Sequence, residues 1–106
     1  MQQGYMAESP LGYAQSGALA ASTLVSSLTF GSATAAGIPA GTQLLIIQCE
    51  TAAVRWRDDG VAPTAAIGYP LAIGQELRYT AHGQQNLRFI GQTGTAIIDV
   101  TAYAGS

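Results

Sequence analysis

The chain has 106 residues, a formal net charge of −2 and a single cysteine. That length supports one hydrophobic core, and a lone thiol excludes an intramolecular disulfide framework and a zinc site built from several cysteines. No stretch reaches the roughly 18 apolar residues that cross a bilayer, and no basic segment followed by an apolar run opens the chain. The sequence therefore predicts neither a membrane span nor a secretion signal.

Charged residues are scarce. They make up 9% of the chain, against about 25% in ordinary globular domains, and there is no lysine. The surface must then consist largely of Ala, Gly, Ser, Thr and Gln, which desolvate at little cost when another chain covers them. We expect a surface that contacts other subunits, with an ordinary neutral monomer as the alternative. Nucleic acid is not an expected partner, because phosphate binding needs clustered Lys and Arg.

The beginning of the chain, up to about residue 41, is rich in Gly, Ala, Ser and Thr. Few large apolar side chains are present there to offset the entropy of ordering. We therefore predict an extended or flexible arm over residues 1–20 and a single domain over residues 21–106. Within that domain, residues 22–30 are predicted to form the first strand, with a short helix over residues 18–28 as the alternative.

From residue 41 onward, apolar residues recur with the period of two that is typical of strands. Residues 43–49 are apolar on both faces, which predicts a central strand. The later strands point these residues inward: Val54 and Trp56; Leu77 and Tyr79; Leu87 and Phe89; Ile98, Val100 and Ala102. Turn chemistry separates the strands at the spacing of a sandwich or barrel. We predict an all-β fold, an antiparallel β-sandwich that is jelly-roll-like and carries an extended N-terminal arm.

Two turns can be predicted in more detail. Residues 58–60, Asp-Asp-Gly, directly follow a strand and suit a tight turn with Gly60 left-handed. The two carboxylates are expected to cap nearby amides or to pair with Arg55 or Arg57. Residues 91–94 are expected to join the last two strands as a hairpin.

No catalytic, cofactor or metal site is predicted. The single histidine, His82, lies in a polar loop with no recognisable nucleophile beside it. Cys49 lies in an apolar strand and is expected to be a buried, unreactive thiol. Asp58 and Asp59 are too few for a calcium loop, and neighbouring residues of a strand point in opposite directions. We therefore expect a protein that is not an enzyme, with a small β-barrel enzyme or ligand binder as an alternative.

The aromatic residues divide into two groups. Those in phase with aliphatic neighbours are assigned to the core, and tyrosines outside clear strands are left for contacts between subunits. A face that stacks on sugars is the alternative for these tyrosines. The predicted interface residues are Tyr5, Tyr13, Tyr69, Arg55, Arg57 and Arg88.

One stretch carries a family resemblance. Residues 54–64 read Val-Arg-Trp-Arg-Asp-Asp-Gly-Val-Ala-Pro-Thr, and residues 68–71 read Gly-Tyr-Pro-Leu before a glycine and a strand that ends in Tyr79. Together with residues 87–90, Leu-Arg-Phe-Ile, and the β-rich C-terminus, this pattern resembles a small family of tailed-bacteriophage and prophage virion structural proteins. The resemblance covers about residues 40–103.

The resemblance implies a virion protein that is assembled in the host cytoplasm and needs no cofactor. We expect a capsid decoration or cement protein that stabilises the head by adhesion between subunits. It would act as a homo-oligomer, with a trimer favoured, bound to the major capsid protein or another virion protein. The alternative within the same family is a tail or head-fibre module that contacts glycans on the host surface.

Overall fold

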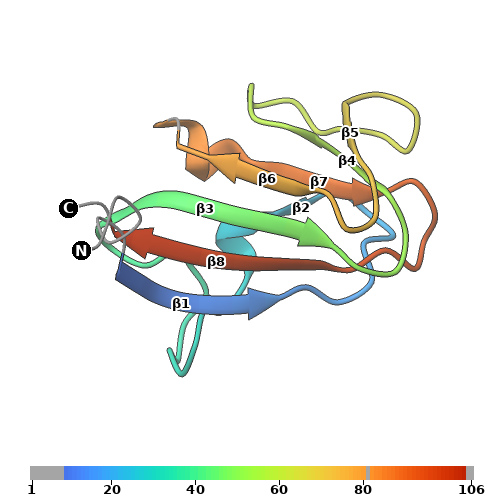
Figure 1. The fold of residues 1–106 in the computed structure, drawn as a ribbon. Coiled ribbons are helices and arrows are strands. Elements are labelled where there is room, and N and C mark those ends of the chain that lie inside the picture. The colour runs from blue at the N-terminus through green and yellow to red at the C-terminus, as the bar shows by residue number, and fades with distance from the viewer. Residues whose placement is uncertain (1–8, 81, 105–106) are drawn as a thin grey trace.

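Two four-stranded antiparallel sheets face each other in the computed structural model, which describes residues 9–80 and 82–104 (Figure 1). One sheet has the order β1-β8-β3-β6 and the other has the order β2-β7-β4-β5. The strands of the first sheet are β1 (Ser9–Gln15), β8 (Ile98–Ala104), β3 (Thr42–Cys49) and β6 (Glu76–Tyr79). Those of the second are β2 (Thr23–Leu24), β7 (Arg88–Gly91), β4 (Val54–Arg57) and β5 (Tyr69–Leu71).

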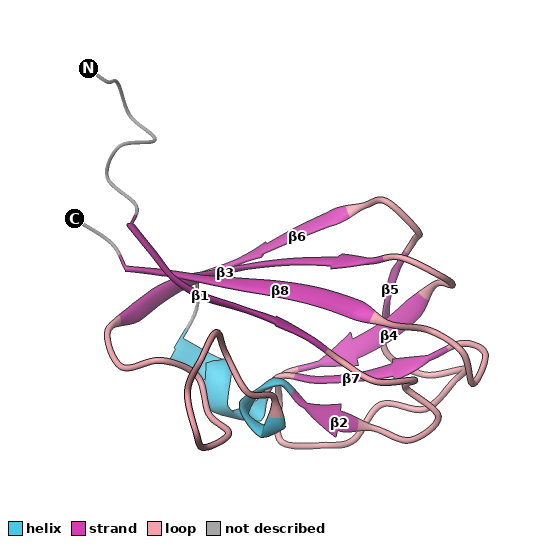
Figure 2. Cartoon of the chain, turned by 90° about the horizontal axis from the view of Figure 1, so that it is seen from below, coloured by secondary structure: helices cyan, strands magenta, loops and turns pink. Residues whose placement is uncertain are grey.

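The strand order is that of a jelly roll, in which the chain passes back and forth between the two layers (Figure 2). Its first and last strands lie side by side, with Ser9 opposite Ala104 and Gln15 opposite Asp99. The central strand β3 pairs with β8 on one side and β6 on the other. The prediction of an all-β, antiparallel, jelly-roll-like sandwich is confirmed.

The core fills the space between the two sheets. Most of its side chains come from the strand positions that the period of two selects, and Val54, Phe89 and Val100 are each 0% exposed. Burial of one such side chain contributes about 1.5–3 kcal/mol. Cys49 is also buried, and its thiol donates to the carbonyl oxygens of Leu71 (3.3 Å) and Ala72 (3.1 Å). The prediction of a buried cysteine is therefore confirmed.

The segment predicted as an arm contributes a strand to the sandwich. Its described part is extended, as expected, but residues 9–15 pair with β8 as an edge strand and Leu19 lies in the core. The domain therefore begins by residue 9 rather than at residue 21. Small side chains permit this packing, because a Cβ on Gly12 would lie 3.1 Å from Phe30 Cβ. Residues 1–8, including the predicted interface residue Tyr5, lie outside the described residues.

The first predicted strand is much shorter than expected. Within residues 22–30 only Thr23–Leu24 forms a strand, β2, and a 3₁₀ turn, η2 (Val25–Ser27), follows it. The Ser27 hydroxyl donates to the Leu24 carbonyl at 2.6 Å, a local bond that competes with strand pairing. The predicted strand is therefore present but confined to two residues, and the alternative helix over residues 18–28 is wrong. A second 3₁₀ turn, η3 (His82–Asn86), precedes β7.

The predicted hairpin over residues 91–94 is also wrong. It would pair β7 with β8, but these strands belong to different sheets, so the connection crosses from one layer to the other. The chain folds back tightly at Gly91, where a Cβ would lie 2.2 Å from the carbonyl oxygen of Thr93. Only glycine fits this crossing.

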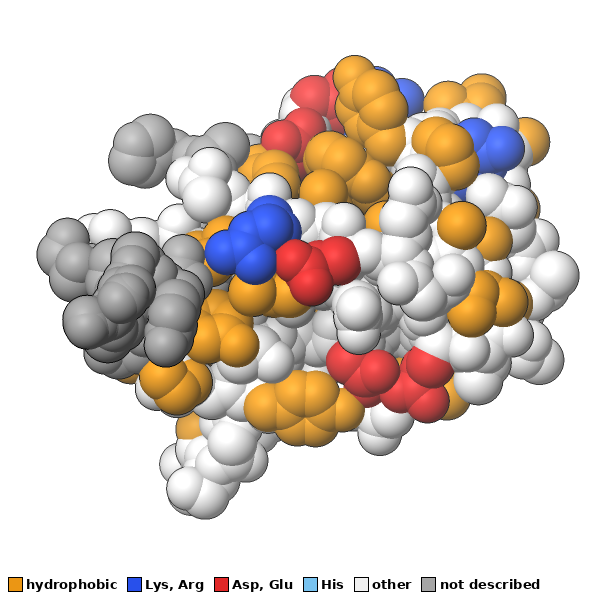
Figure 3. Space-filling view, viewed as in Figure 1, with side chains coloured by type: hydrophobic (Ala, Val, Ile, Leu, Met, Phe, Trp, Pro, Cys, Tyr) orange, Lys and Arg blue, Asp and Glu red, His pale blue; other side chains and the backbone are white. Residues whose placement is uncertain are grey.

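Charged side chains on the side seen in Figure 3 occur as a few separate groups on a mostly neutral surface. The ion pairs among the described residues join close sequence neighbours, Arg57 with Asp59 and Arg78 with Glu76. The surface therefore has few charges to desolvate, as the composition predicted.

Candidate functional site

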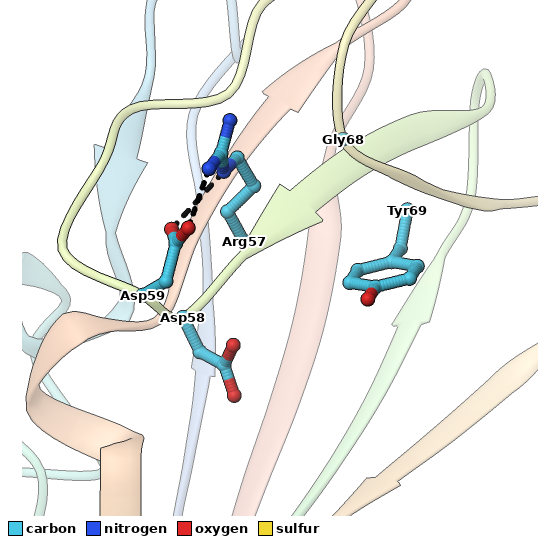
Figure 4. Close-up of a pocket in the computed structure, with 5 residues that line it drawn as sticks. All are labelled: Arg57, Asp58, Asp59, Gly68 and Tyr69. Atoms are coloured by element: carbon cyan, nitrogen blue, oxygen red, sulfur yellow. Dashed lines mark hydrogen bonds and ion pairs between the residues drawn. The ribbon is translucent and has the colours of Figure 1, made fainter.

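An open pocket of about 300 Å³ lies where β4 ends and β5 begins (Figure 4). The pocket is lined by Arg57, Asp58, Asp59, Gly68 and Tyr69. The antiparallel pairing of β4 with β5 places Trp56 opposite Tyr69, so residues 13 positions apart in the chain meet at this end of the sheet. We call this site the β4–β5 pocket.

The first wall of the pocket is an ion pair. Arg57 Nε donates to Asp59 Oδ1 at 3.0 Å, and Arg57 Nη2 donates to Asp59 Oδ2. The amide of Val61 also donates to Asp59 Oδ1, at 3.3 Å. The hydrogen bonds from the guanidinium lower the pKa of Asp59, and the same pairing raises the pKa of Arg57. The predicted pairing of this turn with Arg57 is present.

The neighbouring carboxylate, Asp58, has a different partner. The hydroxyl of Tyr79 donates to Asp58 Oδ2 at 2.6 Å. Burial and this hydrogen bond raise the pKa of Tyr79 to about 12, so the phenol remains a donor throughout the neutral range. Within residues 9–80 and 82–104, no group donates a hydrogen bond to Asp58 Oδ1. This oxygen remains available as an acceptor.

The ring of Tyr69 forms another side of the pocket. Tyr69 is 64% exposed, yet its ring centroid lies 5.0 Å from that of Trp56 at an interplanar angle of 37°. Trp56 in turn meets Tyr79 edge to face, with centroids 6.2 Å apart. Tyr69 therefore presents a large apolar surface to solvent from a ring that other aromatic residues hold in place.

The loop that closes the pocket is held by its own hydrogen bonds. Arg55 donates from Nε to the carbonyl of Ala65 (3.1 Å) and from Nη1 to the carbonyl of Gly68 (2.9 Å). The Thr64 hydroxyl accepts from the amide of Ile67 at 2.9 Å. Gly68 has φ +138° and a Cβ there would lie 3.1 Å from the Trp56 carbonyl oxygen, so this position requires glycine. The loop is thus pre-organised around the pocket.

The predicted interface residues do not form one surface. Tyr69, Arg55 and Arg57 lie at or beside the β4–β5 pocket, and both arginines are already engaged within the chain. Tyr13 lies on β1 in the other sheet, and Arg88 on β7 is half-buried.

The two remote residues also have internal partners. The Tyr13 hydroxyl donates to Asp99 Oδ1 at 2.6 Å, and this bond raises the pKa of Tyr13 to about 12. Arg88 Nη1 donates to the hydroxyl of Ser22 at 3.4 Å. These contacts account for both side chains without a second subunit.

Sequence reasoning selected Tyr69 but missed the other apolar residues near the pocket. In the described part of the chain, most of the exposed large apolar side chains lie between residues 61 and 73, and each of these is more than half exposed. They are Val61, Ile67, Tyr69 and Ile73, which we call the apolar loop residues. The available signal was the position of Ile67 and Ile73 directly before glycines, outside the predicted strands.

Comparison of the chain with protein-family models, curated proteins and solved structures gives no significant match. Among residues 9–80 and 82–104, no three His, Cys, Asp or Glu side chains lie together in an arrangement that could hold a metal ion. No helix in this same part of the structure is both long and apolar enough to cross a membrane. The β4–β5 pocket offers an aromatic surface, a free carboxylate oxygen and a fixed ion pair, which is a set of groups suited to binding.

Proposed function

We propose that this chain is a structural protein of a tailed-phage virion, acting as a capsid decoration or cement protein. The observation that carries the proposal is the concentration of exposed apolar side chains in strand β5 and the connections on either side of it, on an otherwise weakly charged sandwich. A monomeric soluble domain rarely groups such residues without a partner to cover them. The resemblance over residues 40–103 and the jelly-roll strand order, which viral capsid domains also use, support this role.

Adhesion through these side chains has a favourable energy balance. Val61, Ile67 and Ile73 are each more than half exposed, so covering one of them contributes about half of the 1.5–3 kcal/mol of a full burial. Arg55 and Arg57 beside them already have hydrogen-bond partners within the chain, so assembly leaves neither guanidinium without a partner. A modest gain at each contact becomes large when many copies cover one shell.

The sheet edges favour contacts through loops over strand pairing. In the second sheet the edge strands β2 and β5 have two and three residues, and Pro70 removes a donor from β5. On the longer edge strand β1, the carbonyl of Tyr13 already accepts a bond from the Gly31 amide at 2.8 Å. We therefore propose that Val61 and Ile67 contact the major capsid protein or another virion protein, with the chain present as a homotrimer.

Electron cryo-microscopy of virions that carry this chain tests the proposal directly. Copies spread over the head surface, with Ile67 and Val61 against a neighbouring subunit, are the expected result. A few copies at one vertex or on the tail would instead support the fibre module.

Rebinding to virions that lack the chain gives a second test. Ile67→Ser should lower the amount of protein that sediments with the particles, whereas the matched variant Leu11→Ser, on the other sheet, should bind as the parent does. A chain that stays monomeric and never sediments with particles would contradict adhesion.

A further inference from the structure

The geometry of the β4–β5 pocket points to a second activity: we propose that it binds a neutral pyranose unit of a glycan. Sugar sites combine an apolar aromatic surface with a few fixed hydrogen-bonding groups. The pocket has both, and its volume of about 300 Å³ lies at the lower end of the range of small-molecule sites. This activity does not require that the chain decorates a capsid. It requires that the Tyr69 ring stay uncovered, which a capsid contact through Val61 and Ile67 allows.

Tyr69 supplies the apolar surface. A pyranose presents C–H groups on its face, and these pack on a flat ring while its hydroxyls point outward. The Tyr69 ring is 64% exposed but is held 5.0 Å from Trp56, so it loses little side-chain freedom when a ligand stacks on it. This combination of exposure and fixed position distinguishes Tyr69 from a tyrosine that is merely on the surface.

Asp58 supplies the acceptor for a sugar hydroxyl. A carboxylate can only accept hydrogen bonds, and Tyr79 occupies just one of its two oxygens. The same bond fixes the carboxylate against the core, so Asp58 Oδ1 is positioned before a ligand arrives. Figure 4 shows Asp58 and Tyr69 on different sides of the pocket.

Arg57 supplies a donor at the edge of the pocket. Its Nε and Nη2 groups donate to Asp59, and Nη1 has no partner among residues 9–80 and 82–104. In Figure 4 this nitrogen points away from Asp58 and Tyr69, so it can donate to a part of the glycan that extends beyond the stacked ring. Asp59 holds the guanidinium in place for this contact.

The charges select against anionic ligands. Asp59 pairs with Arg57, so an anion would meet the Asp58 carboxylate, whereas a neutral polyol can donate a hydroxyl hydrogen bond to this carboxylate. The fixed loop, held by Arg55 and by the positive-φ Gly68, keeps these groups at one spacing. The recognised ligand is therefore a neutral hexose or N-acetylhexosamine.

Ligand-observed saturation-transfer NMR on the full chain tests this site. The probes are glucose, galactose, mannose, N-acetylglucosamine and short oligosaccharides of each, with glucosamine as a cationic probe and sialic acid as an anionic one. We expect transfer to at least one neutral sugar and none to sialic acid. Absence of transfer to every neutral probe would overturn the proposal, as would binding to glucosamine alone that added salt abolishes.

Variants then locate the site. Tyr69→Ala should raise the Kd about tenfold through loss of stacking, and Tyr69→Phe should retain binding because the ring remains. Tyr13→Ala is the matched control, since Tyr13 is a 51% exposed tyrosine on the other sheet, and its Kd should equal that of the parent. Asp58→Asn should weaken binding while its side-chain oxygen still accepts from Tyr79. Equal affinity of Tyr69→Ala and the parent would show that the sugar binds elsewhere.

Discussion

The hydroxyl of Tyr79 on β6 donates a 2.6 Å hydrogen bond to Oδ2 of Asp58 at the end of β4, and so joins the two sheets of the sandwich. Tyr79 is 5% exposed and belongs to the core, whereas Asp58 lines the pocket. The position of the pocket carboxylate Asp58 therefore depends on how the two layers pack. The hydrogen bond from Tyr79 to Asp58 therefore links a core residue to a residue of the pocket.

Removal of that bond should cost stability. Tyr79→Phe is expected to lower the free energy of unfolding by about 1–2 kcal/mol, because the bond is partly buried and its acceptor is charged. Urea unfolding followed by tryptophan fluorescence measures the change, since Trp56 lies 6.2 Å from Tyr79 and is the sole tryptophan. Tyr103→Phe is the control, because that hydroxyl has no partner among the described residues. Equal stability of the two variants would contradict the role of the bond.

Two tyrosines should titrate late in the folded protein. Hydrogen bonding to Asp99 raises the pKa of Tyr13 to about 12, and burial together with Asp58 raises that of Tyr79 to about 12, from an ordinary value of 10.0. Since both folded pKa values are raised, their contribution to stability is complete below pH 10 and is lost as the pH rises toward about 12.

Tyrosinate absorbance during alkaline titration checks this directly. Tyr79→Phe and Tyr13→Phe should each remove one late-titrating group from the curve. A folded protein in which all tyrosines ionise together near pH 10 would show that the two hydrogen bonds do not persist in solution.

Much of the fold could be predicted because side-chain alternation is a local property of a strand. Val54, Phe89 and Val100 are buried as expected, because successive side chains of a strand point to opposite faces of the sheet. The prediction of a hairpin over residues 91–94 was wrong because a glycine-rich turn can join two strands of the same sheet or two strands of different sheets. Strand β1 was missed because its small residues carry a weak apolar signal, and its position is set by pairing with β8 at the far end of the chain.

Only the contacts of the candidate site that join close sequence neighbours could be predicted. The pairing of Arg57 with Asp59 followed from their separation of two residues. The hydrogen bond between Asp58 and Tyr79 spans 21 residues. It depends on β6 packing across from β4 in the other sheet, which a local sequence pattern does not predict. The exposed ring of Tyr69 likewise depends on its register opposite Trp56 in the second sheet.

Gly91 should tolerate no side chain. A Cβ there would lie 2.2 Å from the Thr93 carbonyl oxygen and 2.8 Å from Ala96 Cβ, so Gly91→Ala must move backbone at the crossing between sheets. We expect a loss of about 1–3 kcal/mol, seen as a lower Tm. At Gly94 the nearest contact would be Ala20 Cβ at 3.9 Å, so Gly94→Ala should change stability by less than about 0.5 kcal/mol. A Gly91→Ala protein that melts with the parent would contradict the tight crossing.

Ser16 should secure the end of the pairing between β1 and β8. It is 6% exposed, its amide donates to the Ile98 carbonyl at 3.0 Å, and its hydroxyl accepts from the Ile98 amide at 2.9 Å. Ser16→Ala leaves that buried amide without its acceptor, which should cost about 1–3 kcal/mol. Ser32→Ala, at an exposed position, is the control and should be neutral.

Amide hydrogen exchange separates a local from a global effect of this substitution. If the hydroxyl holds the strand end, the Ile98 amide should exchange faster in Ser16→Ala by a larger factor than Val100, which lies further along β8. Uniform acceleration along β8 would mean that Ser16 affects only overall stability. An Ile98 amide that stays as protected as in the parent would show that water or another group replaces the hydroxyl, and that the edge strand does not depend on it.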